Sequence, residues 1–192
     1  MVRFKELTIL PLNDISSIDL AYAVTLYSSK VGGYLEVKVS NCSIDVERFR
    51  YRITSIGKQY FADAIIQEGL RLKGDGVLIM LTSSDIYTYG VNYVFGLAVK
   101  GCAVVSRARI DPAFWRSVDE IHAYTSKGRP FFEKQFGKVL LHELGHTVGL
   151  PHCSNESCVM RYSNSPLELY RKGEWFCNIC LRGFTSKVVK RF

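Results

Sequence analysis

At 192 residues and 21.8 kDa, the chain is long enough for one domain with a substantial core and a small appendage. With 47% hydrophobic and 22% charged residues and no low-complexity tract or internal repeat, its composition excludes a disordered or fibrous protein, and no apolar run approaches the roughly 20 residues of a membrane span. The formal charge of +7 keeps an acidic partner such as nucleic acid open, although a solvated basic surface is the simpler interpretation.

The first half of the chain alternates strand and helix patterns. Apolar runs predict strands at residues 4–12 and 77–81, and alternating polar and apolar side chains predict another at 34–39. Helical spacing predicts one helix from Asp14 or Ser17 to about Lys30, stopped by Gly32-Gly33, and a second at 59–72, closed by Gly74 and Gly76. The stretch 40–56 has no clear pattern. This order predicts an α/β fold with a twisted, mostly parallel sheet.

The middle of the chain predicts an antiparallel edge for that sheet. Residues 86–93 are rich in aromatic side chains and fit no element, but 94–98 and 102–110 are two strands joined across Lys100-Gly101. An edge strand beside a catalytic site can hold an extended peptide by main-chain hydrogen bonds. The alternative is that a loop merely covers this edge.

A long helix is predicted to follow. Asp111-Pro112 breaks the chain before a short helix at 113–120, and Gly128-Arg129-Pro130 then resembles a helix start, with proline in the first turn. The apolar positions beyond it recur at helical spacing to about residue 148. The isolated His122 is interpreted as an ordinary surface histidine.

The strongest motif is the run from His142 to His152, which has the form HExxHxxGxxH. Histidines four residues apart lie on one face of a helix, so His142 and His146 can bind one metal ion, while Glu143 beside them can reach a water molecule. Gly149 permits the left-handed conformation that ends a helix, and Pro151 prevents the helix from resuming. The turn would bring His152 back as a third ligand and leave a fourth position open, as catalytic zinc sites require.

Four of the six cysteines form a second candidate metal site. The N-terminal residues do not resemble a signal peptide, so the cytoplasm is the expected location and a disulfide framework is disfavoured. The CxxxxC and CxxC spacings instead fit a closed structural zinc site, with two disulfides as the alternative. Its ligands would be Cys153, Cys158, Cys177 and Cys180. Cys42 and Cys102 lack such spacing and are predicted to be buried thiols.

The histidine run, the cysteine pairs and Met160 together resemble the archaemetzincin family of the metzincin clan of zinc peptidases. The resemblance covers residues 142–180. It implies a compact, monomeric enzyme that hydrolyses peptide bonds with two zinc ions, one catalytic and one structural. It also implies that His142, His146 and His152 hold the catalytic zinc, that Glu143 is the general base for a zinc-bound water, and that Met160 lies in the turn beneath the site.

The predicted architecture has two parts. Residues 1–149 form an α/β subdomain that ends with the long active-site helix, and residues 150–192 form a small zinc-stabilised subdomain with the third ligand and the four cysteines. Tyr162 follows Met160 closely. A tyrosine there could donate a hydrogen bond to a developing oxyanion, but packing is the preferred interpretation.

Two other functions remain open. Zinc endoribonucleases use a similar histidine spacing, but they lack a glutamate at the second position and the cysteine pairs. A non-catalytic module could bind nucleic acid through the four-cysteine site and the basic tail, where Lys187, Lys190 and Arg191 cluster. A peptide or protein is therefore the expected partner, nucleic acid is disfavoured, and no membrane is expected.

Overall fold

Five strands form the main sheet of the computed structural model, which describes residues 4–115, 121 and 123–188. The strand order is β2-β1-β5-β8-β7. The first four run parallel, and β7 pairs antiparallel with β8 at one edge. The predicted mostly parallel sheet with an antiparallel edge strand is confirmed. The strands are β1 (Glu6–Pro11), β2 (Glu36–Val39), β5 (Val77–Thr82), β7 (Gly96–Val99) and β8 (Cys102–Ser106).

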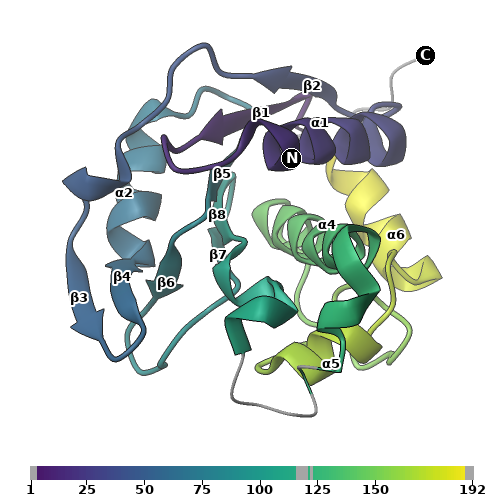
Figure 1. The fold of residues 1–192 in the computed structure, drawn as a ribbon. Helices are drawn as coiled ribbons and strands as arrows, with labels where there is room; N and C mark the ends of the chain where they lie inside the picture. Colours follow the sequence, from purple (N-terminus) through teal and green to yellow (C-terminus); the bar gives the residue numbers. More distant parts are fainter. Residues whose placement is uncertain (1–3, 116–120, 122, 189–192) are drawn as a thin grey trace.

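Helices cover both faces of this sheet (Figure 1). Helices α1 (Ser17–Val31) and α4 (Gly128–Thr147) lie on one face, and α2 (Ala62–Leu72) lies on the other. Side chains alternate between two cores along each strand, as strand geometry requires. Leu7 and Ile79 pack in the core shared with α1 and α4, whereas Leu78 and Met80 pack in the core shared with α2. Strands β5 and β8 are therefore buried along their whole length.

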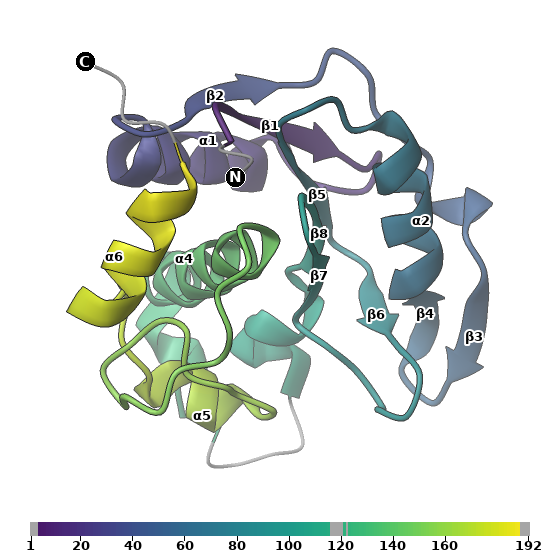
Figure 2. The same ribbon diagram turned by 180° about the vertical axis from the view of Figure 1, so that it is seen from behind.

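The last part of the chain packs against α4. Helices α5 (Pro166–Arg171) and α6 (Asn178–Lys187) lie on the same side of the sheet as α4, as the reverse view shows (Figure 2). Leu150, Val159 and Phe184 belong to the same core as Leu7 and Leu144. A division at residue 149 stays a prediction, since one core joins its two sides. Within the described residues, no helix is long and apolar enough to cross a membrane.

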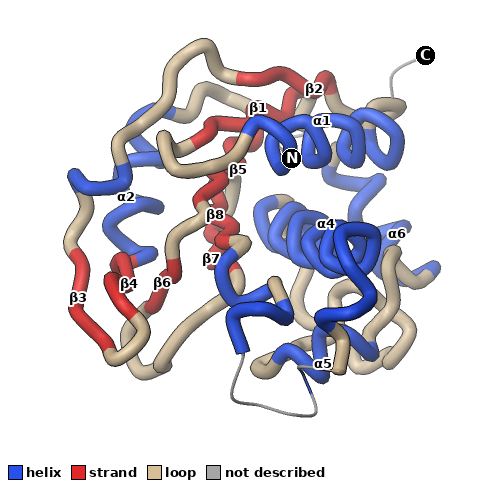
Figure 3. The backbone as a smooth tube through the Cα atoms, viewed as in Figure 1, coloured by secondary structure: helices blue, strands red, loops and turns tan. Residues whose placement is uncertain are grey.

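A second, three-stranded sheet was not predicted (Figure 3). It contains β3 (Tyr51–Thr54), β4 (Gly57–Phe61) and β6 (Asp85–Tyr87). The predicted helix start at Gln59 is wrong, because Gln59 lies in β4 and α2 begins only at Ala62. The buried Gln59 amide donates to the Asp85 carboxylate at 3.0 Å, and this long-range bond favours the strand.

Other boundaries also differ from the predictions. Strand β8 ends at Ser106, and residues 108–110 form a 3-10 turn. A second 3-10 turn, Pro112–Trp115, replaces the start of the helix predicted at 113–120. The rest of that helix, His122, Lys190 and Arg191 lie outside the described residues. Cys102 is buried as predicted, but Cys42 is exposed, so the prediction of a buried thiol there is wrong.

Candidate metal centre

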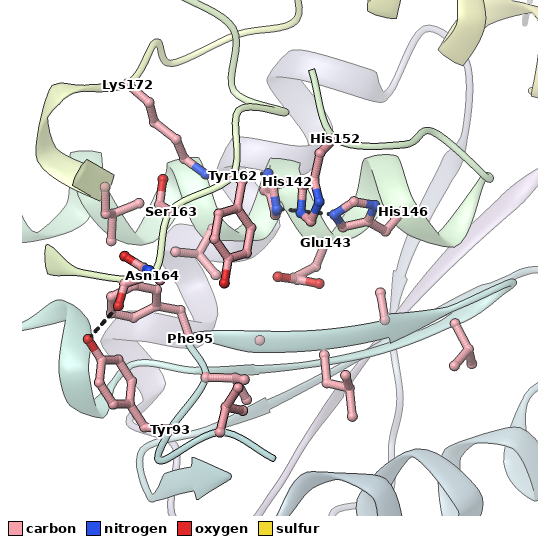
Figure 4. Close-up of a pocket in the computed structure, with 18 of the residues that line it drawn as sticks. Tyr93, Phe95, His142, Glu143, His146, His152, Tyr162, Ser163, Asn164 and Lys172 are labelled. Carbon is pink, nitrogen blue, oxygen red and sulfur yellow. Dashed lines mark hydrogen bonds between the residues drawn. The ribbon is translucent and has the colours of Figure 1, made fainter. Parts of the chain in front are cut away.

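The three histidines converge because α4 ends in a tight turn. Helix α4 continues to Thr147, and Gly149 has a φ of +91°, a backbone conformation that favours glycine. The Leu150 N–H donates to the Gly145 carbonyl at 2.9 Å, which closes the turn. The chain then reverses, and the His152 side chain meets those of His142 and His146 (Figure 4).

The geometry of the three rings fits a metal ion. One ligand atom from each of His142, His146 and His152 lies within 4.8 Å of the other two, and the Nε2 atoms of His142 and His146 are 3.1 Å apart. The Nδ1 atom of His142 donates to the Val159 carbonyl and that of His146 to the Leu150 carbonyl, both at 2.8 Å. A carbonyl can only accept, so each Nε2 is left unprotonated for a metal.

Burial sets the charge of these groups in the metal-free chain. It lowers the pKa of all three histidines, that of His142 to about 2, so the imidazoles are neutral, as metal ligands must be. Burial raises the pKa of Glu143 to about 8, while the cation of Lys172 acts in the opposite direction. In the metal-free chain, Glu143 therefore holds its proton more readily than an ordinary glutamate.

Met160 and Tyr162 flank the histidines in different ways. Met160 is fully buried against α4, where a Cβ added at Gly145 would overlap the Met160 sulfur. Glycine at this position thus lets the methionine approach the helix. The Tyr162 ring is 55% exposed and contacts the His152 ring edge to face, with centroids 4.9 Å apart. Its hydroxyl is available at the surface of the cavity.

The four clustered cysteines form a second group that fits a metal. Their sulfur atoms all lie within 4.8 Å of one another, and all are free thiols. The backbone N–H of Cys180 contributes most to holding the pKa of Cys177 at about 7, which favours the thiolate that zinc binds. The sulfurs come from the turn after His152 and from the start of α6. The members of the cluster are Cys153, Cys158, Cys177 and Cys180.

A cavity of about 870 Å³ opens beside the histidines. Its walls are α4, residues 90–100 including β7, and residues 162–164 (Figure 4). Sequence reasoning did not identify Tyr93, Gly96, Ser163, Asn164 or Lys172 as part of this site, because each reaches it through long-range packing. The free edge of β7 that the sequence predicted does border the cavity.

Comparisons with known proteins agree with this architecture. The model of peptidase family M54 matches residues 23–186. The archaemetzincin of Methanopyrus kandleri is 36% identical over 168 residues, which are 84% of this chain and 85% of that protein.

Two solved archaemetzincins are also similar in structure. That of M. kandleri has a TM-score of 0.70 and 29% identity, and the match covers 96% of this chain and 95% of the other. That of Archaeoglobus fulgidus, a complex with malonate, also has a TM-score of 0.70 and 29% identity, with 93% and 99% covered. The chain therefore belongs to peptidase family M54, the archaemetzincins, a family of zinc metallopeptidases.

Proposed function

We propose that this chain hydrolyses peptide bonds with a zinc ion held by His142, His146 and His152 and with Glu143 as general base. The observation that carries the proposal is the convergence of three neutral imidazoles beside a buried carboxylate on the wall of a cavity. A zinc ion bound there supplies a Lewis acid that polarises a carbonyl and lowers the pKa of a water molecule. This donor set, three histidines with room for a further ligand, is typical of catalytic zinc.

Glu143 moves the proton in this mechanism. Its carboxylate is 6% exposed and faces the cavity, so it can take a proton from the attacking water. The same oxygen then returns the proton to the leaving amine, which cannot depart as an anion. The base needs no covalent bond to the substrate, and no serine or cysteine nucleophile is proposed.

The edge of β7 orients the substrate. Strand β7 pairs with β8 on one side, and its other side borders the cavity. An extended peptide can add to this edge by main-chain hydrogen bonds, which would place its carbonyl groups below the histidines. Such binding depends on backbone rather than side-chain groups, and therefore accepts many sequences.

The four-cysteine cluster is proposed to hold a second, structural zinc ion. Four thiolates complete a tetrahedral site and leave no position for water, so this ion would have no catalytic role. Cys153 directly follows His152, and the ion would therefore fix the chain that carries the third catalytic ligand. In this proposal residues 150–192 act as a zinc-stabilised subdomain of a monomeric cytoplasmic enzyme.

Gly96→Ala should lower peptide hydrolysis about 10- to 100-fold without removing zinc. A Cβ at Gly96 would lie 2.6 Å from Cγ and 2.7 Å from Oε1 of Glu143, so the carboxylate must move. A displacement of roughly 1 Å can cost about 100-fold in rate. The matched control is Gly74→Ala, which has open space around its Cβ. Zinc content and kcat/KM of both variants check the prediction, and equal rates for the two would contradict it.

The proposed function is tested by digestion of a diverse peptide library. Zinc-loaded protein should cut a subset of peptides, and the same protein stripped by a chelator should cut none until zinc is restored. Mass spectrometry identifies the cut bonds and the side chains on either side of them. Zinc-dependent cleavage of structured RNA with no cut peptide would instead support the endoribonuclease alternative.

A further inference from the structure

A buried lysine lies behind the metal ligands. Lys172 follows α5, is 5% exposed, and lines the cavity together with Val139 and Leu169. Lysine is almost never fully buried unless its ammonium group has a partner, because removing a charge from water is costly. The contacts of this ammonium group therefore indicate what it binds.

The protein itself satisfies this ammonium group poorly. The Lys172 Nζ atom lies 3.3 Å from His142 Nδ1 and 3.3 Å from the Arg161 carbonyl oxygen. His142 Nδ1 already donates its proton to Val159 and cannot accept another. The three N–H groups of Lys172 therefore share a single long hydrogen bond, to the Arg161 carbonyl. Among the described residues, no carboxylate forms an ion pair with Lys172, and Glu143 acts on it only from a greater distance.

A second buried lysine, in contrast, has good hydrogen-bond partners for its ammonium group. Lys138, one helical turn before His142, is 2% exposed. Its Nζ atom donates to the carbonyls of Leu169 at 3.1 Å and Tyr170 at 2.9 Å, and it does not line the cavity. Lys138 therefore has a structural role in holding α5. Lys172 differs from it in facing the cavity with donors to spare.

A hydrogen bond joins two walls of the cavity near the residues that precede β7. The Tyr93 hydroxyl donates to the Asn164 carbonyl at 2.9 Å and so joins the two walls (Figure 4). The Arg109 guanidinium lies 4.2 Å from the centroid of the Tyr93 ring and is itself held by two bonds of 2.8 Å to Asp85. Next to this bridge, Ser163 lines the cavity with a buried hydroxyl that has no hydrogen-bond partner among the described residues.

The direction of β7 decides which end of a peptide lies toward the bridge between Tyr93 and Asn164. Because Tyr93 precedes Gly96 in the chain, the bridge lies at the N-terminal end of β7. A peptide paired antiparallel with β7 therefore has its C-terminal side toward the bridge. Antiparallel pairs outnumber parallel ones two- to three-fold in proteins, and a parallel peptide would bring its positively charged amino end toward Lys172.

We propose that Lys172 binds a carboxylate of the substrate residue that follows the scissile bond, with the Ser163 hydroxyl as a second donor. The inference rests on the proposed peptidase function and adds a specificity to it. An aspartate or glutamate side chain and a C-terminal carboxylate present the same acceptor atoms, so either can occupy this position. An ammonium–carboxylate pair is among the stronger polar contacts in proteins.

The test uses four peptides built around one cut found in the library. Two are acetylated and amidated hexapeptides that differ only in glutamate or glutamine after the cut. The other two end at that residue, a glutamine, as the free acid or as the amide. For zinc-loaded wild type, in one of the two pairs, we expect the peptide with the carboxylate to have at least about a tenfold higher kcat/KM than its uncharged partner. The pair that shows this difference tells whether the carboxylate comes from a side chain or from the C-terminus.

The variants separate recognition from support of the fold. The carboxylate preference is the ratio of the two kcat/KM values within a pair. Lys172→Met should bring this ratio close to one, Lys172→Arg should retain most of it, and the control Lys138→Met should keep the wild-type value. A ratio measured within one protein sample does not depend on the fraction folded or loaded. Calorimetric binding of the same peptides to zinc-loaded Glu143→Gln protein gives a second readout that needs no turnover.

The outcomes distinguish this inference from the function on which it rests. Wild-type protein that cleaves both members of each pair equally well would overturn the role of Lys172 and leave the peptidase function intact. A preference that survives Lys172→Met would also overturn it. Wild-type protein that cuts no peptide of the library would overturn the proposed function and, with it, this inference. When peptides are cut, equal calorimetric affinities within each pair would reject the carboxylate site alone.

Discussion

Zinc-loaded protein that carries Glu143→Gln is expected to cleave its peptides about a thousand times more slowly than wild type, with unchanged zinc content. Glutamine keeps the shape of glutamate but cannot accept a proton, and a positioned general base contributes roughly 10²–10⁴-fold to a rate. The three histidines keep their carbonyl partners in this variant, so the metal site should stay intact. Steady-state kinetics and metal analysis of the same preparation check both halves of the expectation.

The same substitution should not destabilise the metal-free fold. Burial raises the folded pKa of Glu143 to about 8, well above its ordinary value, so ionised Glu143 costs stability as the pH rises through that interval. Glutamine carries no charge, and at neutral pH the thermal midpoint of the metal-free variant should equal or exceed that of wild type. The control is Glu133→Gln on the same helix, where Glu133 pairs with Arg129 at 2.7 Å. Equal rates for Glu143→Gln and wild type, at equal zinc content, would remove Glu143 from the mechanism.

The two candidate metal-binding groups could be predicted from the sequence because the spacing of their residues is local. Helix periodicity alone places His142 and His146 on one face, and one glycine turn brings His152 back six residues later. The four cysteines are similarly marked by short spacings. Both groups converge in the structure. For the histidines, ten residues of helix and turn leave little freedom in between.

The rest of the cavity could not be predicted because long-range packing builds it. Lys172 reaches His142 across 30 positions of the sequence, and Tyr93 reaches Asn164 across 71. A lone lysine or tyrosine has no motif, and nothing in its neighbours distinguishes it from an exposed one. Gly96 carried a faint signal as a glycine inside the strand predicted at 94–98, because glycine within a strand often marks close approach of another group.

The fold likewise has one part that could be predicted from the sequence and one part that could not. The main sheet was predictable since strands buried on both faces, such as β5, are continuous apolar runs with helical crossovers. The sheet of β3, β4 and β6 was not, because its strands are short and mix polar with apolar residues. Its stability comes from contacts such as the hydrogen bond between Gln59 and Asp85, which no local sequence pattern predicts.

We expect Cys177→Ser to remove zinc from both centres and to lower the thermal midpoint by about 10 °C. Structural zinc contributes roughly 10–16 kcal/mol of apparent binding energy in zinc-finger peptides, so losing even about 3 kcal/mol of it matters. In a chain of this length, 1 kcal/mol corresponds to about 2–4 °C. Metal analysis of the variant should find less than one zinc ion per chain, whereas loss of the structural ion alone would leave one.

The coupling arises because one segment serves both sites. Cys153 follows His152, and the Cys153 N–H donates to the Met160 carbonyl at 2.9 Å, which folds residues 153–160 into a loop. Val159 in that loop orients His142 through its carbonyl. Release of the cysteines therefore loosens two of the three histidines at once. The control Cys42→Ser changes an exposed thiol outside the cluster and should keep full zinc. A Cys177→Ser chain that loses one zinc ion but remains fully active would show that the two centres are independent.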